Sequence, residues 1–132
     1  MHAHNALLVC ILVSLSLNGY ATRDEARIED RTLENSCDDV VVIGKIDNGK
    51  YQHVSNPDDL IGHGWFDATI SVRKVVRGPR LPKVIPVRYF AHTYMREDRE
   101  FMFVLNRTEN GILVIRTGQT TALRPTLSTP CE

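Results

Sequence analysis

The chain has 132 residues, 42% of them hydrophobic, and its 16 basic and 16 acidic side chains leave no net charge at pH 7. The length suits one domain, and the balanced charge gives no reason to expect a nucleic-acid-binding protein. The charge is unevenly spread, because residues 22–67 carry 11 acidic and 5 basic side chains whereas residues 68–132 carry 5 and 11. Either the two halves neutralise each other in the fold, which we favour, or the basic stretch attracts a polyanion.

A leader opens the chain. Residues 6–17 are almost purely apolar and are followed by small residues at Gly19 and Ala21, which fit the cleavage rule of secretory leaders. The run is too short to span a bilayer, which needs roughly 20 residues. We therefore predict a signal peptide over residues 1–21 and a secreted or periplasmic protein with no membrane span after cleavage. An uncleaved anchor is the alternative, because no basic residue precedes the apolar run.

Cleavage would leave two cysteines, Cys37 and Cys131. A lone pair of cysteines in an exported chain predicts a structural disulfide. The disulfide would bracket one domain, residues 37–132, preceded by a polar spacer, residues 22–36, that forms a short helix or stays disordered. It would also tie down a C-terminal tail that shows no other anchor.

Five segments between the cysteines have the patterns of β-strands. The clearest begins at Trp65, where Phe66, Ala68 and Ile70 alternate with polar residues, as in a strand with one buried face. The alternation slips at residues 74–76, as at a bulge, and Gly44 indicates a second bulge or bend. The predicted strands are Val40–Ile46, Trp65–Val76, Val84–Ala91, Phe101–Leu105 and Ile112–Thr117.

Turn signals separate these segments. Residues 47–49 (Asp-Asn-Gly) predict a turn, residues 51–64 a loop, and residues 106–111 a hairpin loop. Five short antiparallel strands without a convincing long helix predict an all-β fold, a small five-stranded OB-like barrel. Asn106 opens a glycosylation sequon in the last loop, whose use depends on the source of the protein.

The order of these segments resembles the OB-fold domain of netrin-like modules, a group that includes the amino-terminal domains of tissue inhibitors of metalloproteinases. The resemblance covers about residues 37–117 and rests on Cys37, the valine-rich strand 39–45, and the long strand 66–79 with its final basic-Gly-Pro turn. It implies an extracytoplasmic barrel that binds a partner. It does not imply metalloproteinase inhibition, because those inhibitors start with a zinc-clamping Cys-x-Cys and Cys37 has no such neighbour.

The most site-like stretch is Gly62–Trp65, where two glycines allow close approach and the only tryptophan opens the long strand. If Trp65, Asp67, Thr69 and Arg73 face outward together, they form a polar strip with an aromatic end, on a face that barrels of this class use for ligands. Alternatively, Trp65 plugs the end of the barrel. Residues 89–94, where a strand breaks into a loop, are a second candidate for the site, although we favour packing as the role of their aromatic side chains. The ligand-binding candidates are His63, Trp65, Asp67, Arg73 and His92.

Three functions remain open. The first is a non-catalytic exported binding module with a protein or glycan partner outside the cytoplasm and no cofactor. The second is a polyanion binder, for lipopolysaccharide or another acidic glycan, through the basic segment 73–96. The third is a small metal-dependent hydrolase built on His63, Asp67 and His92, although their spacing matches no metal-site motif.

Overall fold

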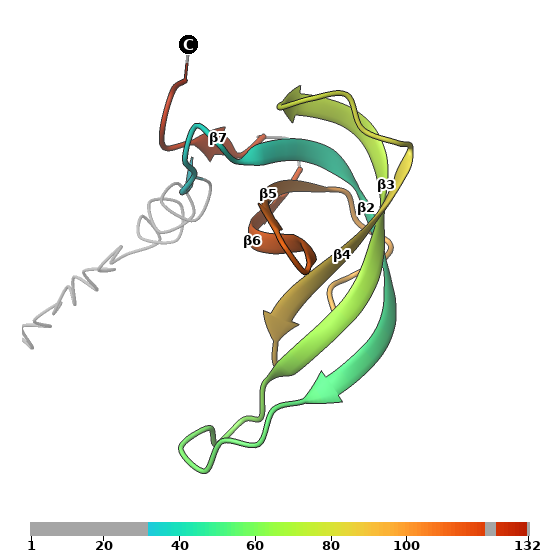
Figure 1. Ribbon diagram of the computed structural model, residues 1–132, viewed down its shortest axis with the longest axis vertical. Coiled ribbons are helices and arrows are strands. Elements are labelled where there is room, and N and C mark those ends of the chain that lie inside the picture. Colours follow the sequence, from blue (N-terminus) through green and yellow to red (C-terminus); the bar gives the residue numbers. More distant parts are fainter. Residues whose placement is uncertain (1–31, 121–123, 132) are drawn as a thin grey trace, which may run out of the picture.

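The computed structural model describes residues 32–120 and 124–131. These residues form strands and no helix, so the predicted all-β class is confirmed, and none of their elements is a helix that could cross a membrane. The predicted leader and residues 22–31 of the predicted spacer lie outside the described ranges. The strands (Figure 1) are β1 (Thr32–Leu33), β2 (Val40–His53), β3 (Gly64–Arg77), β4 (Val84–Ala91), β5 (Phe101–Thr108), β6 (Gly111–Gln119) and β7 (Thr126–Leu127).

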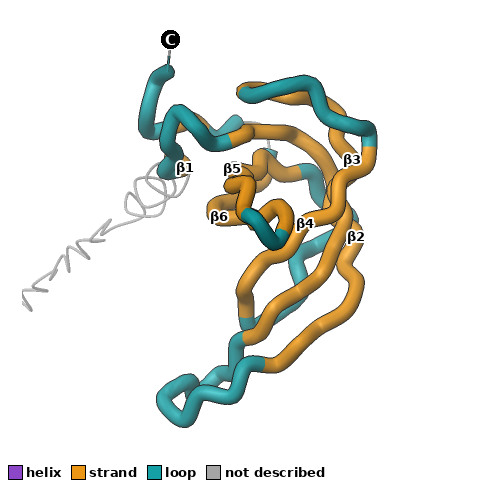
Figure 2. Tube along the Cα trace, viewed as in Figure 1, coloured by secondary structure: helices purple, strands orange, loops and turns teal. Residues whose placement is uncertain are grey.

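Strands β2 to β6 form one strongly curved sheet (Figure 2). Its two longest strands, β2 and β3, form a hairpin that runs along the length of the sheet. In the order β2-β3-β4-β6-β5, antiparallel ladders join β2 to β3, β3 to β4 and β5 to β6, and β5 pairs back onto β2. Between β4 and β6 the link is one parallel residue pair, Arg88 with Leu113. All five predicted strands are present. The prediction that every strand pairs antiparallel is wrong at this junction between β4 and β6, which we call the seam, because its one ladder pair is parallel.

The alternation of β3 builds the inner core. Phe66, Ala68 and Ile70 are buried, whereas Trp65 and Asp67 lie on the opposite, outward face. Burial of one such large apolar side chain contributes about 1.5–3 kcal/mol. The buried residues of this inner cluster are Val40, Val42, Ile46, Phe66, Ala68, Ile70, Ile85, Val87, Tyr89, Phe101, Phe103 and Leu105.

A second cluster covers the outside of β2 and β5. The two short strands β1 and β7 pair in parallel and place Leu33 and Leu127 over this outer face. The segment Phe101–Leu105 is therefore apolar on both of its faces, because each face meets a different core. The buried residues of the outer cluster are Leu33, Val41, Ile43, Met102 and Val104.

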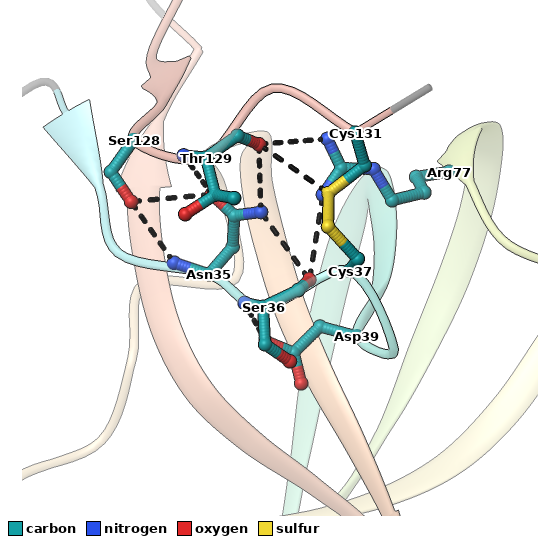
Figure 3. Close-up of a disulfide and its surroundings, with 8 residues drawn as sticks. All are labelled: Asn35, Ser36, Cys37, Asp39, Arg77, Ser128, Thr129 and Cys131. Atoms are coloured by element: carbon teal, nitrogen blue, oxygen red, sulfur yellow. Dashed lines mark hydrogen bonds between the residues drawn. A yellow bond between two sulfur atoms is a disulfide. The ribbon is translucent and has the colours of Figure 1, made fainter.

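The predicted disulfide between Cys37 and Cys131 is present, with the two Cα atoms 5.6 Å apart (Figure 3). The tail has further anchors that the sequence did not reveal. The Asn35 side chain accepts a bond from the Thr129 N–H (3.0 Å) and donates one to the Thr129 carbonyl (3.2 Å), to which Arg77 also donates. The expectation of a helical or disordered spacer is wrong for Thr32–Leu33, which form β1 because β7 supplies a partner strand.

The turn predicted at residues 47–49 is wrong, because β2 runs through it. The ladder with β3 becomes irregular between Asn48 and Tyr51 instead. Asn48 is held there by the segment between β4 and β5: its backbone N–H donates to Glu97 (2.8 Å) and its side chain donates to the Met95 carbonyl (2.8 Å). Gly49 serves close packing, since a Cβ atom would lie 2.8 Å from the Asp67 carbonyl oxygen.

Both predicted bulges are confirmed, and the one at residues 74–76 is a register shift between Val41 and Val42, which skips Val76 on β3. The β2–β3 register shifts between Ile43 and Gly44, and a Cβ atom on Gly44 would collide with the carbonyl oxygen of Ser71. The last hairpin is tighter than predicted, because Thr108 pairs with Gly111 and only two residues form the turn. Asn106, in the sequon, therefore belongs to β5, where its side-chain amide donates to Asp39 (3.3 Å).

Candidate functional site

Two cross-strand pairs and a pair of histidines lie in a row on the outward face of β3 and β4 and beside its end. Trp65 pairs with Phe90, and Asp67 pairs with Arg88, in the antiparallel register. Just before β3 and just after β4, the rings of His63 and His92 lie 5.5 Å apart. We call this set the aromatic face: His63, Trp65, Asp67, Arg88, Phe90 and His92.

The rings of this face are in contact with one another, His63 stacked on Phe90 and Trp65 tilted against it. The Trp65 and Phe90 centroids are 5.1 Å apart, and His63 stacks on Phe90 at 5.5 Å. The Arg88 guanidinium carbon lies 5.1 Å from the Trp65 ring centre, a cation–π contact worth about 0.5–1 kcal/mol at an exposed site. Phe90 nevertheless keeps 49% of its surface exposed. The stacking thus fixes the rings in place while leaving an apolar surface open to solvent.

Arg88 is held on three sides. Its Nε lies 2.8 Å from Asp67 Oδ1, an ion pair in which the N–H finds no aligned acceptor among the described residues. Its terminal nitrogen donates to Gln52 on β2 (3.0 Å), and Trp65 lies under the guanidinium. The pair is too exposed to add more than about 1 kcal/mol of stability. Its effect is to orient a guanidinium and a carboxylate side by side on the surface.

His63 is positioned by the loop that precedes β3. Asp59 accepts hydrogen bonds from the His63 backbone N–H (2.6 Å), from its Nδ1 (2.7 Å) and from the Gly62 N–H (3.0 Å). Partial burial alone would raise the pKa of Asp59, but these bonds from His63 and Gly62 outweigh it and lower that pKa. The carboxylate therefore stays ionised and fixes the imidazole against Phe90.

A shallow groove of ≈ 300 Å³ continues the face across the β4–β6 seam. Asp67 and Arg88 line it from the sheet of β3 and β4, and Asn110 of the β5–β6 turn and Gly111 at the start of β6 line it from the other strand pair. The floor is mainly apolar, supplied by Pro86 and its neighbours. A ligand on the aromatic face would thus meet a polar pair and an apolar groove next to the rings.

The structure brings together four of the five residues proposed from the sequence: His63, Trp65, Asp67 and His92. Arg73 lies apart at the bulged end of β3, where it makes two hydrogen bonds to Glu100. Trp65 does not plug the end of the sheet, because it shares the outward face with Asp67. These positions follow from the strand period and from the bulge beyond Val72.

Sequence reasoning favoured packing for Phe90 and missed Arg88 and Gln52 as members of the site. The signal for the first two was available, because Val87 and Tyr89 point into the core and strand alternation then places Arg88 and Phe90 outside. Gln52 was not considered because residues 51–64 were predicted to be a loop, whereas β2 extends to His53.

The geometry gives no support to a hydrolase built on His63, Asp67 and His92. Asp67 pairs with Arg88, and the carboxylate bonded to His63 is that of Asp59. Within residues 32–120 and 124–131, no three His, Cys, Asp or Glu side chains are grouped to hold a metal ion. The face can stack against a ligand and hydrogen-bond it.

The basic segment 73–96 is partly neutralised. Arg73 pairs with Glu100, Arg88 with Asp67, and Arg96 with Asp98, where each partner is acidic. Of these three pairs between described residues, the Asp67 pair is the one that joins the acidic half of the chain to the basic half. Arg77 is occupied by the carbonyls of Ser36 and Thr129. Three of the seven basic side chains of this segment thus face a carboxylate, whereas Arg77 is held in place and keeps its charge.

Comparison with protein-family models, curated proteins and solved structures finds no match to this chain.

Proposed function

We propose that this protein is an exported, non-catalytic binding module that holds a protein or glycan partner on the aromatic face. The observation that carries the proposal is the half-exposed Phe90 ring, fixed by Trp65 and His63 on the solvent side of the sheet. When a partner covers an exposed apolar ring whose neighbours already hold it in place, the removal of that surface from water favours binding.

The arrangement of strands supports an OB-like barrel, related in plan to netrin-like modules. Such barrels have five strands in a partly open Greek-key arrangement and bind ligands on strands 2 and 3 and on the loops between strands 1 and 2 and between strands 4 and 5. The corresponding elements here are β3, β4, the β2–β3 loop and the β5–β6 turn. The aromatic face and its groove occupy those places.

Export is proposed from the leader-like start of the chain together with the disulfide. A disulfide persists in oxidising compartments and is rare in the cytosol. Here it bridges two segments 94 residues apart and secures the C-terminal tail on the body of the fold. The partner is accordingly sought among extracellular or periplasmic proteins and glycans.

The test compares Trp65→Ala and Phe90→Ala with the control Val76→Ala, a 39% exposed residue of β3 that is not part of the aromatic face. Binding is measured on a glycan array and by capture from the protein's own extracytoplasmic extract. Loss of a fully covered ring weakens binding by at least about tenfold. Unchanged binding in both face variants, with their circular dichroism spectra intact, would exclude this face as the site.

A further inference from the structure

Two aliphatic side chains stand in solvent at the end of the β2–β3 hairpin. Leu60 is 97% exposed and Ile61 is 67% exposed, the highest values among the large hydrophobic residues described. Figure 1 shows the loop that carries them projecting beyond the rest of the sheet. We call residues 56–61 the hairpin tip.

The hairpin tip is held in this shape by its own hydrogen bonds. Asn56 accepts bonds from the Asp58 N–H with its side chain (3.1 Å) and from the Asp59 N–H with its carbonyl (3.0 Å). Asp59 in turn binds the backbone that follows Ile61. Leu60 and Ile61 therefore point outward from a preorganised turn instead of folding back onto the sheet. Preorganisation of this kind lowers the entropic cost of docking.

A groove of matching character lies further along the same hairpin. It has a volume of ≈ 470 Å³, its aliphatic surface comes from Val72 and the 55% exposed Val84, and Lys45 and Lys83 are among its lining residues. The third basic residue, Arg73, is bound to Glu100. We call this surface the lysine groove.

The hairpin tip and the lysine groove complement each other. The tip offers two aliphatic side chains beside the exposed carboxylate of Asp58, and the groove offers an aliphatic surface beside two ammonium groups with no ion pair in the described part of the chain. They cannot meet within one molecule. The tip ends at Ile61, and on β3 the groove begins at Ser71. The seven strand residues 64–70, at roughly 3.3 Å each, therefore lie between the two surfaces.

We propose that the hairpin tip of one copy docks in the lysine groove of a second copy. Because the two surfaces differ and lie at separate places on each molecule, the contact is heterologous. In the resulting pair, the copy that donates its tip still has a free groove and the copy that receives it still has a free tip, so association continues head to tail into short linear chains. The aromatic face is not part of either surface and stays available to its partner.

Sedimentation velocity on the purified, disulfide-intact protein tests this contact over a wide concentration range. The expected result is a mass that rises continuously with concentration, without stopping at a dimer. Leu60→Asp and Val84→Asp each lower the association constant by at least about tenfold, whereas Val76→Asp, the control on β3, leaves it unchanged. Lys83→Glu, which keeps the aliphatic surface, serves as a second groove variant, and Asp58→Lys paired with it restores association.

Mixing supplies the decisive measurement. Leu60→Asp retains an intact groove and Val84→Asp retains an intact tip, so an equimolar mixture forms a heterodimer that grows no further. Three results would overturn the proposal: a monomer at every concentration, association of Leu60→Asp equal to wild type, or no heterodimer in the mixture. None of these outcomes bears on the aromatic face, which the Trp65 and Phe90 variants test separately.

Discussion

The disulfide and the hydrogen bonds around it make separable contributions, and removing each in turn distinguishes them. The perturbation is the double variant Cys37→Ala/Cys131→Ala, which opens a link between residues 94 apart in the chain. In the chain-entropy model, the loss of a loop of this length costs about 4–5 kcal/mol, because the unfolded chain regains its freedom. That is a large part of a net stability of roughly 5–15 kcal/mol.

The native tail is expected to stay in place without the disulfide. Leu33 pairs with Leu127 in the β1–β7 ladder, and the Ser128 N–H donates to the Leu33 carbonyl (2.9 Å). The Asn35 side chain adds bonds to Thr129, each worth about 1 kcal/mol net. Amide protection at Leu127 should therefore persist in the double variant under native conditions.

Urea unfolding followed by circular dichroism, combined with native-state hydrogen exchange, provides the assay. The double variant should lose about 4–5 kcal/mol and show a larger m-value, because its denatured state is more expanded. The matched variant Asn35→Ala, with the disulfide intact, should lose about 1–3 kcal/mol with an unchanged m-value. A loss below about 1 kcal/mol in the double variant would refute the entropic reasoning. Loss of protection at Leu127 alone would show that the disulfide is the sole anchor.

Two further predictions concern the bulged end of the β2–β3 hairpin. Gly44→Ala drives a methyl group into a backbone carbonyl of β3 and should lower the free energy of unfolding by about 2–4 kcal/mol, measured by urea titration, whereas a loss under about 0.5 kcal/mol would mean that the bulge relaxes. The Arg73 hydrogen bond lowers the pKa of Glu100 below its ordinary value of 4.5, so this carboxylate stabilises the fold above that pH, and the contribution disappears as pH falls through the lowered pKa. Glu100→Gln should accordingly flatten the acid limb of stability against pH, and an identical limb in both proteins would argue against the ion pair.

Much of the sheet could be predicted because its signal is local. In β3, Phe66, Ala68 and Ile70 alternate with outward residues, and the same alternation placed Trp65 and Asp67 on one exposed face. The position of Val84–Ala91 was predicted with its bounds, since an alternating run between turn signals specifies a strand by itself.

The remaining features depend on contacts between distant parts of the chain. The turn signal at Asn48 was overridden by hydrogen bonds to residues nearly 50 positions away. The two-residue strands β1 and β7 have no pattern of their own and exist because each supplies the other's partner. Arg73 left the predicted site because a bulge changes which face the next side chains take.

The seam between β4 and β6 gives the molecule a mechanical weak point. Eight ladder pairs join β5 to β6, whereas one ladder pair, Arg88 with Leu113, joins β6 to β4, where packing of Ile112 and Val114 against the inner cluster provides the remaining contact. Local opening should start there, with β3–β4 moving as one flap and β5–β6 as the other. Because the shallow groove beside Asp67 and Arg88 crosses this seam, local opening of the seam would change the width of the groove. A ligand that contacts both strand pairs would then stabilise the closed seam, and the amide protons of the whole sheet would exchange more slowly.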